Sequence, residues 1–193
     1  MLILDRDAIP PRAGFCDADV AYVLAYLTQN GNAGKGKLAS YLGLGRTSFR
    51  SLITLMINSD LVETSEKMVK ISANGSRLYM AMGIDPLDID IGYSLGTYKQ
   101  AIKVSGAADR ITNGVNQVKI STMFGGVGCS LWIMKNHTLY MPPHLDFNLA
   151  NKGESERIID SADLRDGDVL LVCGAENPRT AKVAAMMVAL DLV

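Results

Sequence analysis

The sequence lacks any long apolar run, and cysteine is scarce. No uninterrupted apolar stretch reaches the roughly 18 residues that a membrane span needs, and no charged segment followed by an apolar one indicates a leader. The three cysteines, Cys16, Cys129 and Cys173, are odd in number, widely spaced and in or beside apolar runs. This usage is typical of reduced, buried thiols. We therefore expect a cytoplasmic protein with no membrane contact.

Histidine is equally scarce, with only His137 and His144 in the chain. No Asp, Glu or Cys stands four residues from either, so a metal site would need distant residues such as Cys129 or Cys173. Neither Cys129 nor Ser130 lies in a recognisable nucleophile elbow or beside a base. The sequence therefore predicts no metal site, no cofactor and no catalytic residue, and we expect a protein that is not an enzyme.

The net charge of -1 gives no global signal for a nucleic-acid partner. The charge is unevenly distributed, however. Residues 31–83 carry seven Lys or Arg against three Asp or Glu, a net +4, whereas residues 84–193 carry ten against thirteen, a net -3. Any nucleic-acid binding is therefore expected in the first half of the chain.

The positive charge gathers around residues 42–62, which predict a turn followed by one helix. Thr47 or Ser48 can cap the helix, and its apolar positions recur at helical spacing: Phe49, Leu52, Ile53 and Met56. The opposite face begins with side chains suited to phosphates and base edges, namely Arg46, Thr47, Arg50 and Ser51. Further along the helix, Leu55 and Ile57 are apolar, so we expect another protein surface to cover them.

The segments on either side complete a small unit. Residues 1–15 predict an arm with at most a short strand over 1–4, and residues 16–30 a helix capped by Asp17. A short helix is expected over 38–42, after a Gly-Lys-Gly-Lys turn that lacks the spacing of a phosphate-binding loop. Strands over 61–64 and 68–72 predict a hairpin, and residues 73–82 predict a last helix.

This order of elements resembles the winged helix-turn-helix domain of prokaryotic and archaeal transcription regulators. The resemblance covers roughly residues 17–82 and rests on Leu-x-x-Tyr-Leu-Gly-Leu before Arg46 and Asp-Leu-Val before the hairpin. It implies that the third helix enters the major groove of double-stranded DNA and that the hairpin touches the backbone or the minor groove. The residues then expected to contact DNA are Arg46, Thr47, Ser48, Arg50, Ser51, Lys35, Lys37, Lys67 and Lys70.

The second half predicts a mixed α+β domain after a linker over 84–91. A strand is expected over 97–104, a helix over 106–124 with Ile111, Val115 and Val118 on one stripe, and a hairpin over 127–134 and 138–141. Residues 148–166 predict a surface loop, 168–173 a buried strand, and 178–190 a helix started by Asn177. The fold class expected is α+β, with a winged helix over 1–83 and an effector-binding or oligomerisation domain over 92–193.

Two glycine-bearing junctions in this half are candidate ligand sites. Gly125, Gly126 and Gly128 lie between a helix and a strand, the wrong order for a dinucleotide fingerprint, so a structural turn competes with a ligand role. Gly174, Asn177 and Arg179 lie where a strand leads into a helix N-terminus, which favours an anion. Against this, Glu176 would repel an anion there.

The whole chain also resembles a family of uncharacterised archaeal proteins in which a winged helix precedes an α/β domain. We therefore expect a DNA-binding transcriptional regulator, a homodimer, with a possible small-molecule effector. Two alternatives remain. In the first, the winged helix serves protein interaction, which the apolar Leu55 and Ile57 favour; in the second, the C-terminal domain is a small-molecule enzyme.

Overall fold

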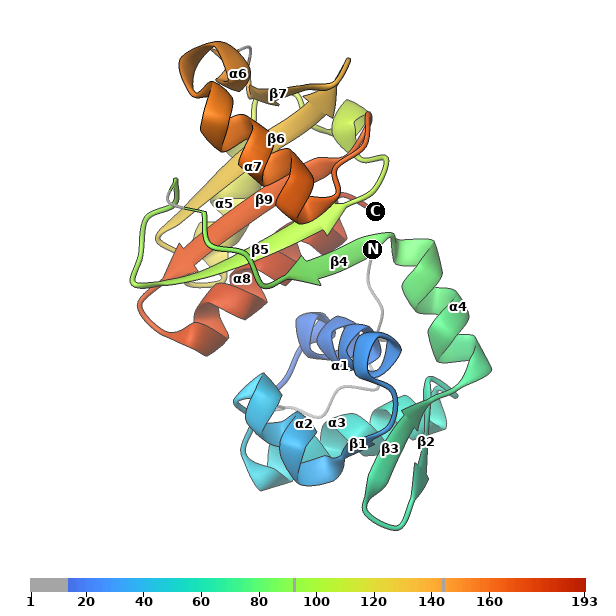
Figure 1. Ribbon diagram of the computed structural model, residues 1–193. Coiled ribbons are helices and arrows are strands. Elements are labelled where there is room, and N and C mark those ends of the chain that lie inside the picture. The colour runs from blue at the N-terminus through green and yellow to red at the C-terminus, as the bar shows by residue number, and fades with distance from the viewer. Residues whose placement is uncertain (1–13, 92, 144) are drawn as a thin grey trace. The chain divides into compact units, whose positions relative to one another are not determined.

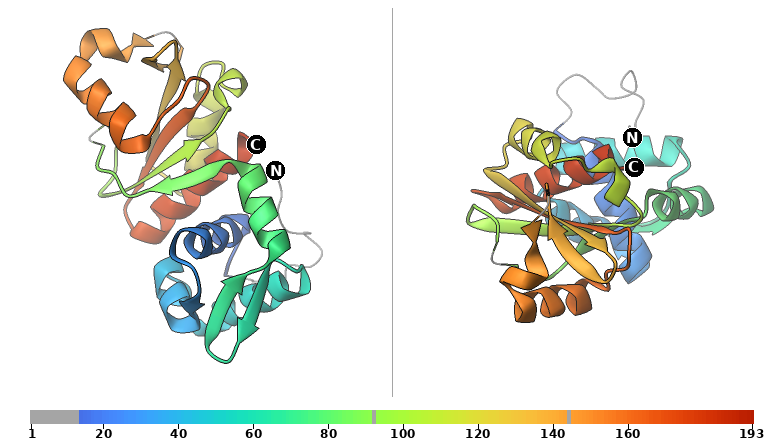
Figure 2. Two further views of the ribbon diagram at one scale, coloured as in Figure 1. Left: turned by 45° about the vertical axis from the view of Figure 1, so that its right-hand side comes forward. Right: turned by 90° about the horizontal axis from the view of Figure 1, so that it is seen from above.

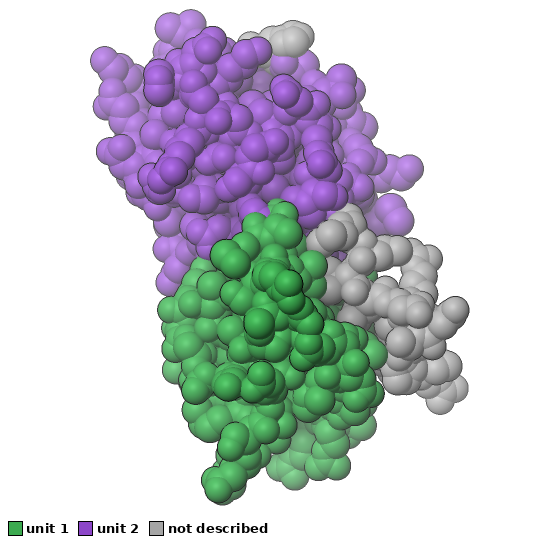
Figure 3. Space-filling view, turned by 90° about the vertical axis from the view of Figure 1, so that its right-hand side faces the viewer, with its two compact units in different colours: residues 1–82 green, residues 83–193 purple. Residues whose placement is uncertain are grey.

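The computed structural model describes residues 14–91, 93–143 and 145–193. The chain divides between Met82 and Gly83 into two compact units, coloured separately in Figure 3. We call them unit 1 and unit 2. The strand predicted over 1–4 and the side chain of His144 lie outside the described residues. No helix in the described segments combines the length and the apolar character needed to cross a bilayer.

Over its described residues, 14–82, unit 1 contains four helices and a small antiparallel sheet (Figure 1). The helices are α1 Asp17–Asn30, α2 Lys35–Leu42, α3 Arg46–Asn58 and α4 Ala73–Met82. The strands β1 Ala33–Gly34, β2 Val62–Ser65 and β3 Met68–Ile71 have the spatial order β1-β3-β2. Leu38, Leu52, Met56 and Val69 are fully buried. The predicted helices and hairpin are thus present, and β1 is an addition that the sequence reading missed.

The helix starts in unit 1 differ from the predictions. Helix α1 is capped by Cys16 rather than Asp17, because the Cys16 amide donates to Asp19 Oδ2 at 2.9 Å. Helix α2 begins at Lys35, three residues early, where the Lys35 amide donates to the Lys67 carbonyl at 2.9 Å. Helix α3 is capped by Gly45, so neither Thr47 nor Ser48 has the capping role expected for it.

Unit 2 is built on a six-stranded antiparallel sheet of order β4-β5-β9-β6-β7-β8. The strands are β4 Ile84–Leu87, β5 Tyr98–Val104, β6 Gly128–Lys135, β7 Thr138–Met141, β8 Leu145–Asp146 and β9 Val169–Ala175. The helices are α5 Val115–Met123, α6 Phe147–Ala150, α7 Lys152–Ala162 and α8 Pro178–Asp191, with a 3-10 helix at Ala108–Arg110. All seven residues of β9 are buried, as expected of a central strand.

Helices cover both faces of this sheet. Helices α6 and α7 lie over one face, and α8 lies over the other with α5 beside it (Figures 1 and 2). The first face holds an apolar core that includes Trp132, Phe147, Ile158 and Leu170. Trp132 and Phe147 meet edge to face, with ring centroids 5.9 Å apart. The last strand thus runs through the middle of a three-layered unit.

Three predictions for unit 2 are wrong. The predicted linker contains β4, in which Ile84 pairs with Val104, and Pro86 is tolerated because β4 is an edge strand. Of the predicted helix over 106–124, only α5 is α-helical: it begins after Gly114, which has φ of 77°, and Ala108–Arg110 forms a separate 3-10 helix. The predicted loop over 148–166 contains α6 and α7, whose buried face includes Ser155 and Ile158.

Candidate nucleic-acid and ligand sites

Helix α3 presents a polar face opposite its buried one. Phe49, Leu52, Ile53 and Met56 are buried, as predicted. Arg46 and Arg50 are exposed and lie one helical turn apart, hence on one face. Neither guanidinium forms an ion pair or side-chain hydrogen bond with any described residue. Thr47 is exposed as well, whereas Ser48 and Ser51 are half-buried.

The apolar second half of α3 is only partly covered. Ile57 remains 41% exposed and Leu55 is half-buried. Thr54 and Asn58 lie beside Ile57 along the helix and are exposed. The polar face that starts at Arg46 therefore ends in an exposed isoleucine.

Three of the four predicted lysines have partners within unit 1. Lys35 Nζ donates to the Glu66 carbonyl at 3.1 Å, at the tip of the β2–β3 hairpin. Lys37 Nζ lies 5.8 Å from the centre of the Tyr26 ring, within the range of a cation–π contact. Lys70 Nζ lies 3.0 Å from Glu63 Oε2. Lys67 is exposed at the hairpin tip. These partners depend on the fold, so local sequence patterns did not reveal them.

Tyr26 also belongs to a cluster of tyrosines. Its ring centroid lies 4.8 Å from that of Tyr41, and the Tyr22 ring meets Tyr41 edge to face at 6.1 Å. Burial, with a smaller contribution from Tyr26, raises the pKa of Tyr41 to about 12. The phenol is therefore uncharged at neutral pH.

The two glycine-bearing junctions of unit 2 meet at one end of the sheet. Gly128 pairs with Gly174 across β6 and β9, and the Val127 amide donates to the Gly174 carbonyl at 2.9 Å. The space beside these glycines is filled by protein. A Cβ on Gly174 would lie 1.5 Å from the Leu95 carbonyl oxygen, and one on Gly126 would lie 2.2 Å from Ser121 Oγ. Close packing against the Leu95 backbone accounts for Gly174, and close packing against Ser121 accounts for Gly126.

The remaining residues of these junctions also have structural roles. A Cβ on Gly125 would lie 2.9 Å from Thr180 Cγ2 on α8. The Asn177 side chain accepts a hydrogen bond from the Thr180 amide at 2.9 Å, which caps α8 as predicted. Arg179 is half-buried and has contacts within the chain. An anion at this junction stays a prediction.

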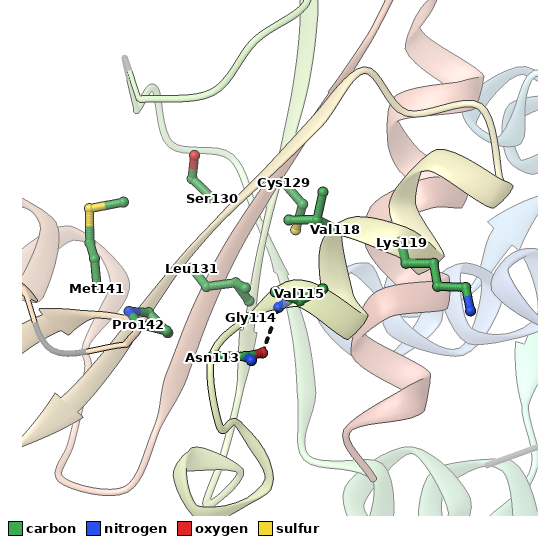
Figure 4. A pocket seen from close by; sticks show the side chains of 10 residues that line it. All are labelled: Asn113, Gly114, Val115, Val118, Lys119, Cys129, Ser130, Leu131, Met141 and Pro142. Atoms are coloured by element: carbon green, nitrogen blue, oxygen red, sulfur yellow. Dashed lines mark hydrogen bonds between the residues drawn. The ribbon is translucent and has the colours of Figure 1, made fainter.

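The more open cavities of unit 2 lie elsewhere, between residues 108–119 and the β6–β7 hairpin. One has a volume of about 440 Å³ (Figure 4). It is lined by Asn113, Gly114, Val115, Val118, Lys119, Cys129, Ser130, Leu131, Met141 and Pro142. A second, of about 460 Å³, is more polar and includes Asp109, Lys135 and Tyr140. Both volumes fall in the range of small-molecule sites.

Helix α5 exposes its apolar side at the first of these cavities. Val115 and Val118 are 65% and 42% exposed, whereas Gln117 and Ser121 are buried. Of the predicted stripe, Val115 and Val118 lie on α5 but are exposed, and Ile111 lies outside the helix. Sequence reasoning missed the cavity because periodicity identifies an apolar stripe but not what covers it. The sequence signal for this exposure was that polar residues, Gln117 and Ser121, occupy the buried positions of α5.

Two thiols lie together beneath this cavity. Cys129 and Cys173 are directly opposite in the β6–β9 ladder, and their Sγ atoms are 3.1 Å apart. Neither is in a disulfide. The hydrogen bond shared with the Cys173 thiol, together with burial, raises the pKa of the Cys129 thiol above its usual range. The Ser130 hydroxyl points to the other side of the strand, where it donates to the Tyr93 carbonyl (Figure 4).

Metal ligands do not converge in the described part of the chain. No group of three or more His, Cys, Asp or Glu side chains there has the arrangement needed to hold an ion. His137 lies in the β6–β7 turn, where its backbone amide donates a hydrogen bond to Asp166 Oδ1 at 2.8 Å.

Together, the fold and these sites define an α+β protein with an exposed basic helix face in unit 1 and open cavities in unit 2. Comparison with known proteins identifies the family to which the chain belongs. The family model described as "Domain of unknown function (DUF4443)" matches residues 95–192, and the chain belongs to this family. The matched residues include almost the whole of unit 2 from the start of β5 onward.

A solved structure shares the fold. The chain is similar to the hypothetical protein PH0730 from Pyrococcus horikoshii OT3, with 22% sequence identity and a TM-score of 0.69. The similarity covers 91% of each chain, so it includes both units. No curated protein matches the sequence significantly.

Proposed function

We propose that this protein is a DNA-binding transcriptional regulator of winged-helix type. The observation that carries the proposal is the pair Arg46 and Arg50, exposed on one face of α3 and unpaired with described residues. Arginine is the side chain best suited to bidentate contacts with phosphates and guanine edges. The opposite face of α3 is buried in unit 1, so the helix is held with its arginines outward.

The β2–β3 hairpin acts as the wing in this proposal. Lys67 at its tip is exposed, and Lys35 on α2 is tied to the tip through the Glu66 carbonyl. Both supply positive charge beside α3 for the DNA backbone, and Lys37 adds to it. Lys70 contributes less, because Glu63 neutralises it.

We infer a homodimer as the DNA-binding form. One recognition helix buries too little surface for the affinity typical of specific binding, and two copies that read half-sites about one DNA turn apart would supply it. The exposed Val115 and Val118 of α5 support unit 2 as the site of a second subunit or an effector. Sedimentation of the wild type and of the Val115→Ser, Val118→Ser double variant distinguishes the two roles: loss of the dimer assigns the valines to the subunit contact.

A protein-interaction role is the second candidate. It is favoured by Ile57, which is 41% exposed at the end of the same α3 face. An exposed isoleucine suits a protein surface better than a DNA groove, where hydrogen-bonding side chains read most base edges.

A titration of the full chain with a fluorescent DNA duplex distinguishes the DNA-binding role from the protein-interaction role. The proposal predicts saturable binding that weakens with salt, together with slower amide hydrogen exchange in residues 46–54 when DNA is bound. An affinity no tighter than the non-specific range of about 10⁻⁴ to 10⁻⁶ M, with unchanged exchange in α3, would favour the protein-interaction role.

A further inference from the structure

Cys129 and Cys173 occupy positions where two strands come closest. The Met134 amide donates to the Asp168 carbonyl at 2.9 Å in the same ladder, and the register continues without a break from Met134 to Cys129. Hydrogen-bonded and non-hydrogen-bonded pairs alternate in such a ladder, so Cys129 and Cys173 form a non-hydrogen-bonded pair. Cα atoms in such pairs are roughly 4.5 Å apart, a separation that a disulfide can span.

The two thiols differ in access. Cys129 is half-buried and lines the cavity of about 440 Å³ beside Val118 (Figure 4). Cys173 is fully buried on β9. A reagent in the cavity therefore reaches the sulfur of Cys129 first, and Cys173 can attack only what forms on Cys129.

We propose that Cys129 and Cys173 form a dithiol site that reacts with small-molecule disulfides and closes to an intramolecular disulfide. In the first step the Cys129 thiolate attacks one sulfur of the small disulfide, forms a mixed disulfide and releases one small thiol. Cys173 then attacks the Cys129 sulfur and displaces the second small thiolate, which takes up the Cys173 proton and leaves as a thiol. Two protein thiols are thereby oxidised, and one small disulfide is reduced to two thiols.

Because the two sulfurs are close together, the second step needs only a small movement of the two side chains. The Sγ atoms are already 3.1 Å apart and must approach to about 2.05 Å, the length of a disulfide bond. Their strands are neighbours in the middle of the sheet, so no element has to move across the fold. Cys16 lies outside unit 2 and is therefore the natural control.

The test exposes the full-length Cys16→Ser variant to oxidised glutathione at alkaline pH, because the raised pKa of Cys129 leaves little thiolate at neutral pH. The protein is then denatured and its remaining thiols are alkylated before peptide mapping. We expect a peptide pair linked through Cys129 and Cys173, with neither thiol alkylated. A chain that keeps both thiols alkylatable, or that accumulates glutathione on Cys129 without the linked pair, would overturn the proposal.

The Cys173→Ser substitution, added to Cys16→Ser, tests the order of the steps. Without the resolving thiol, Cys129 should retain glutathione as a stable mixed disulfide. The Cys129→Ser counterpart should leave the buried Cys173 unmodified in the folded chain. Equal modification of Cys173 in that counterpart would contradict the assigned order, and the linked pair in the Cys16→Ser chain stands as a test whether or not these variants fold.

Discussion

Glu63 and Lys70 face each other across the β2–β3 hairpin, with Lys70 Nζ 3.0 Å from Glu63 Oε2. Both side chains are more than half exposed, at 57% and 55%. An exposed pair of this kind contributes at most about 1 kcal/mol to stability. Its larger effect is on the charge of the hairpin, because Glu63 cancels one of the cations available to a DNA backbone.

The Glu63→Gln variant should therefore bind DNA more tightly while folding almost as stably. Freeing Lys70 for one more phosphate contact raises the slope of log affinity against log salt by about 1. Urea unfolding should change by less than about 1 kcal/mol. The matched control is Glu156→Gln on α7, which removes the same charge from unit 2 at an exposed position. Equal salt slopes for the two variants would show that Lys70 and the hairpin do not contact the DNA.

Gly174→Ala should destabilise unit 2 by about 3 kcal/mol or more, because the new Cβ would collide with the Leu95 carbonyl and the backbone must move. Gly153→Ala on α7 is the control. Its Cβ meets nothing within 4 Å, so the helix should gain up to about 1 kcal/mol. Urea unfolding followed by the fluorescence of Trp132, the only tryptophan, measures both. A Gly174→Ala chain of wild-type stability would mean that the glycine serves something other than packing.

The raised pKa of Tyr41 predicts that the folded protein loses stability at alkaline pH. Its pKa is about 12 in the folded chain, against about 10 in an unfolded one. The folded state therefore holds the phenol proton more tightly, so the contribution of Tyr41 is complete below pH 10 and is lost as the pH rises toward 12. Tyr41→Phe should show a shallower loss between pH 10 and about 12 in urea unfolding. Parallel losses in the two proteins would contradict the shifted pKa.

Local signals were enough to predict much of the fold. Asn177 and Pro178 identified the start of α8, and the apolar run from Val169 identified β9. Elements with mixed signals were missed. Pro86 hid an edge strand, and α7 buries Ser155 and Ala162 together with Ile158, so its pattern looked polar.

The sites were harder to predict because they depend on distant pairings. Arg46 and Arg50 could be placed on an exposed face, since the buried positions of α3 follow from helical spacing. The partner of Lys37 could not be foreseen, because Tyr26 comes from another helix. Cys129 and Cys173 are 44 residues apart, and only the register of β6 against β9 brings them together.

A salt-dependent duplex titration of Arg46→Ala plus Arg50→Ala tests most directly whether these two arginines bind DNA. Lys99→Ala plus Arg110→Ala is the control, since it removes two exposed positive charges from unit 2. We predict that the α3 double variant loses duplex binding at physiological salt, and that any binding left at low salt has a slope lower by about 2. The control should keep the wild-type slope. A double variant that binds like the wild type would contradict the account.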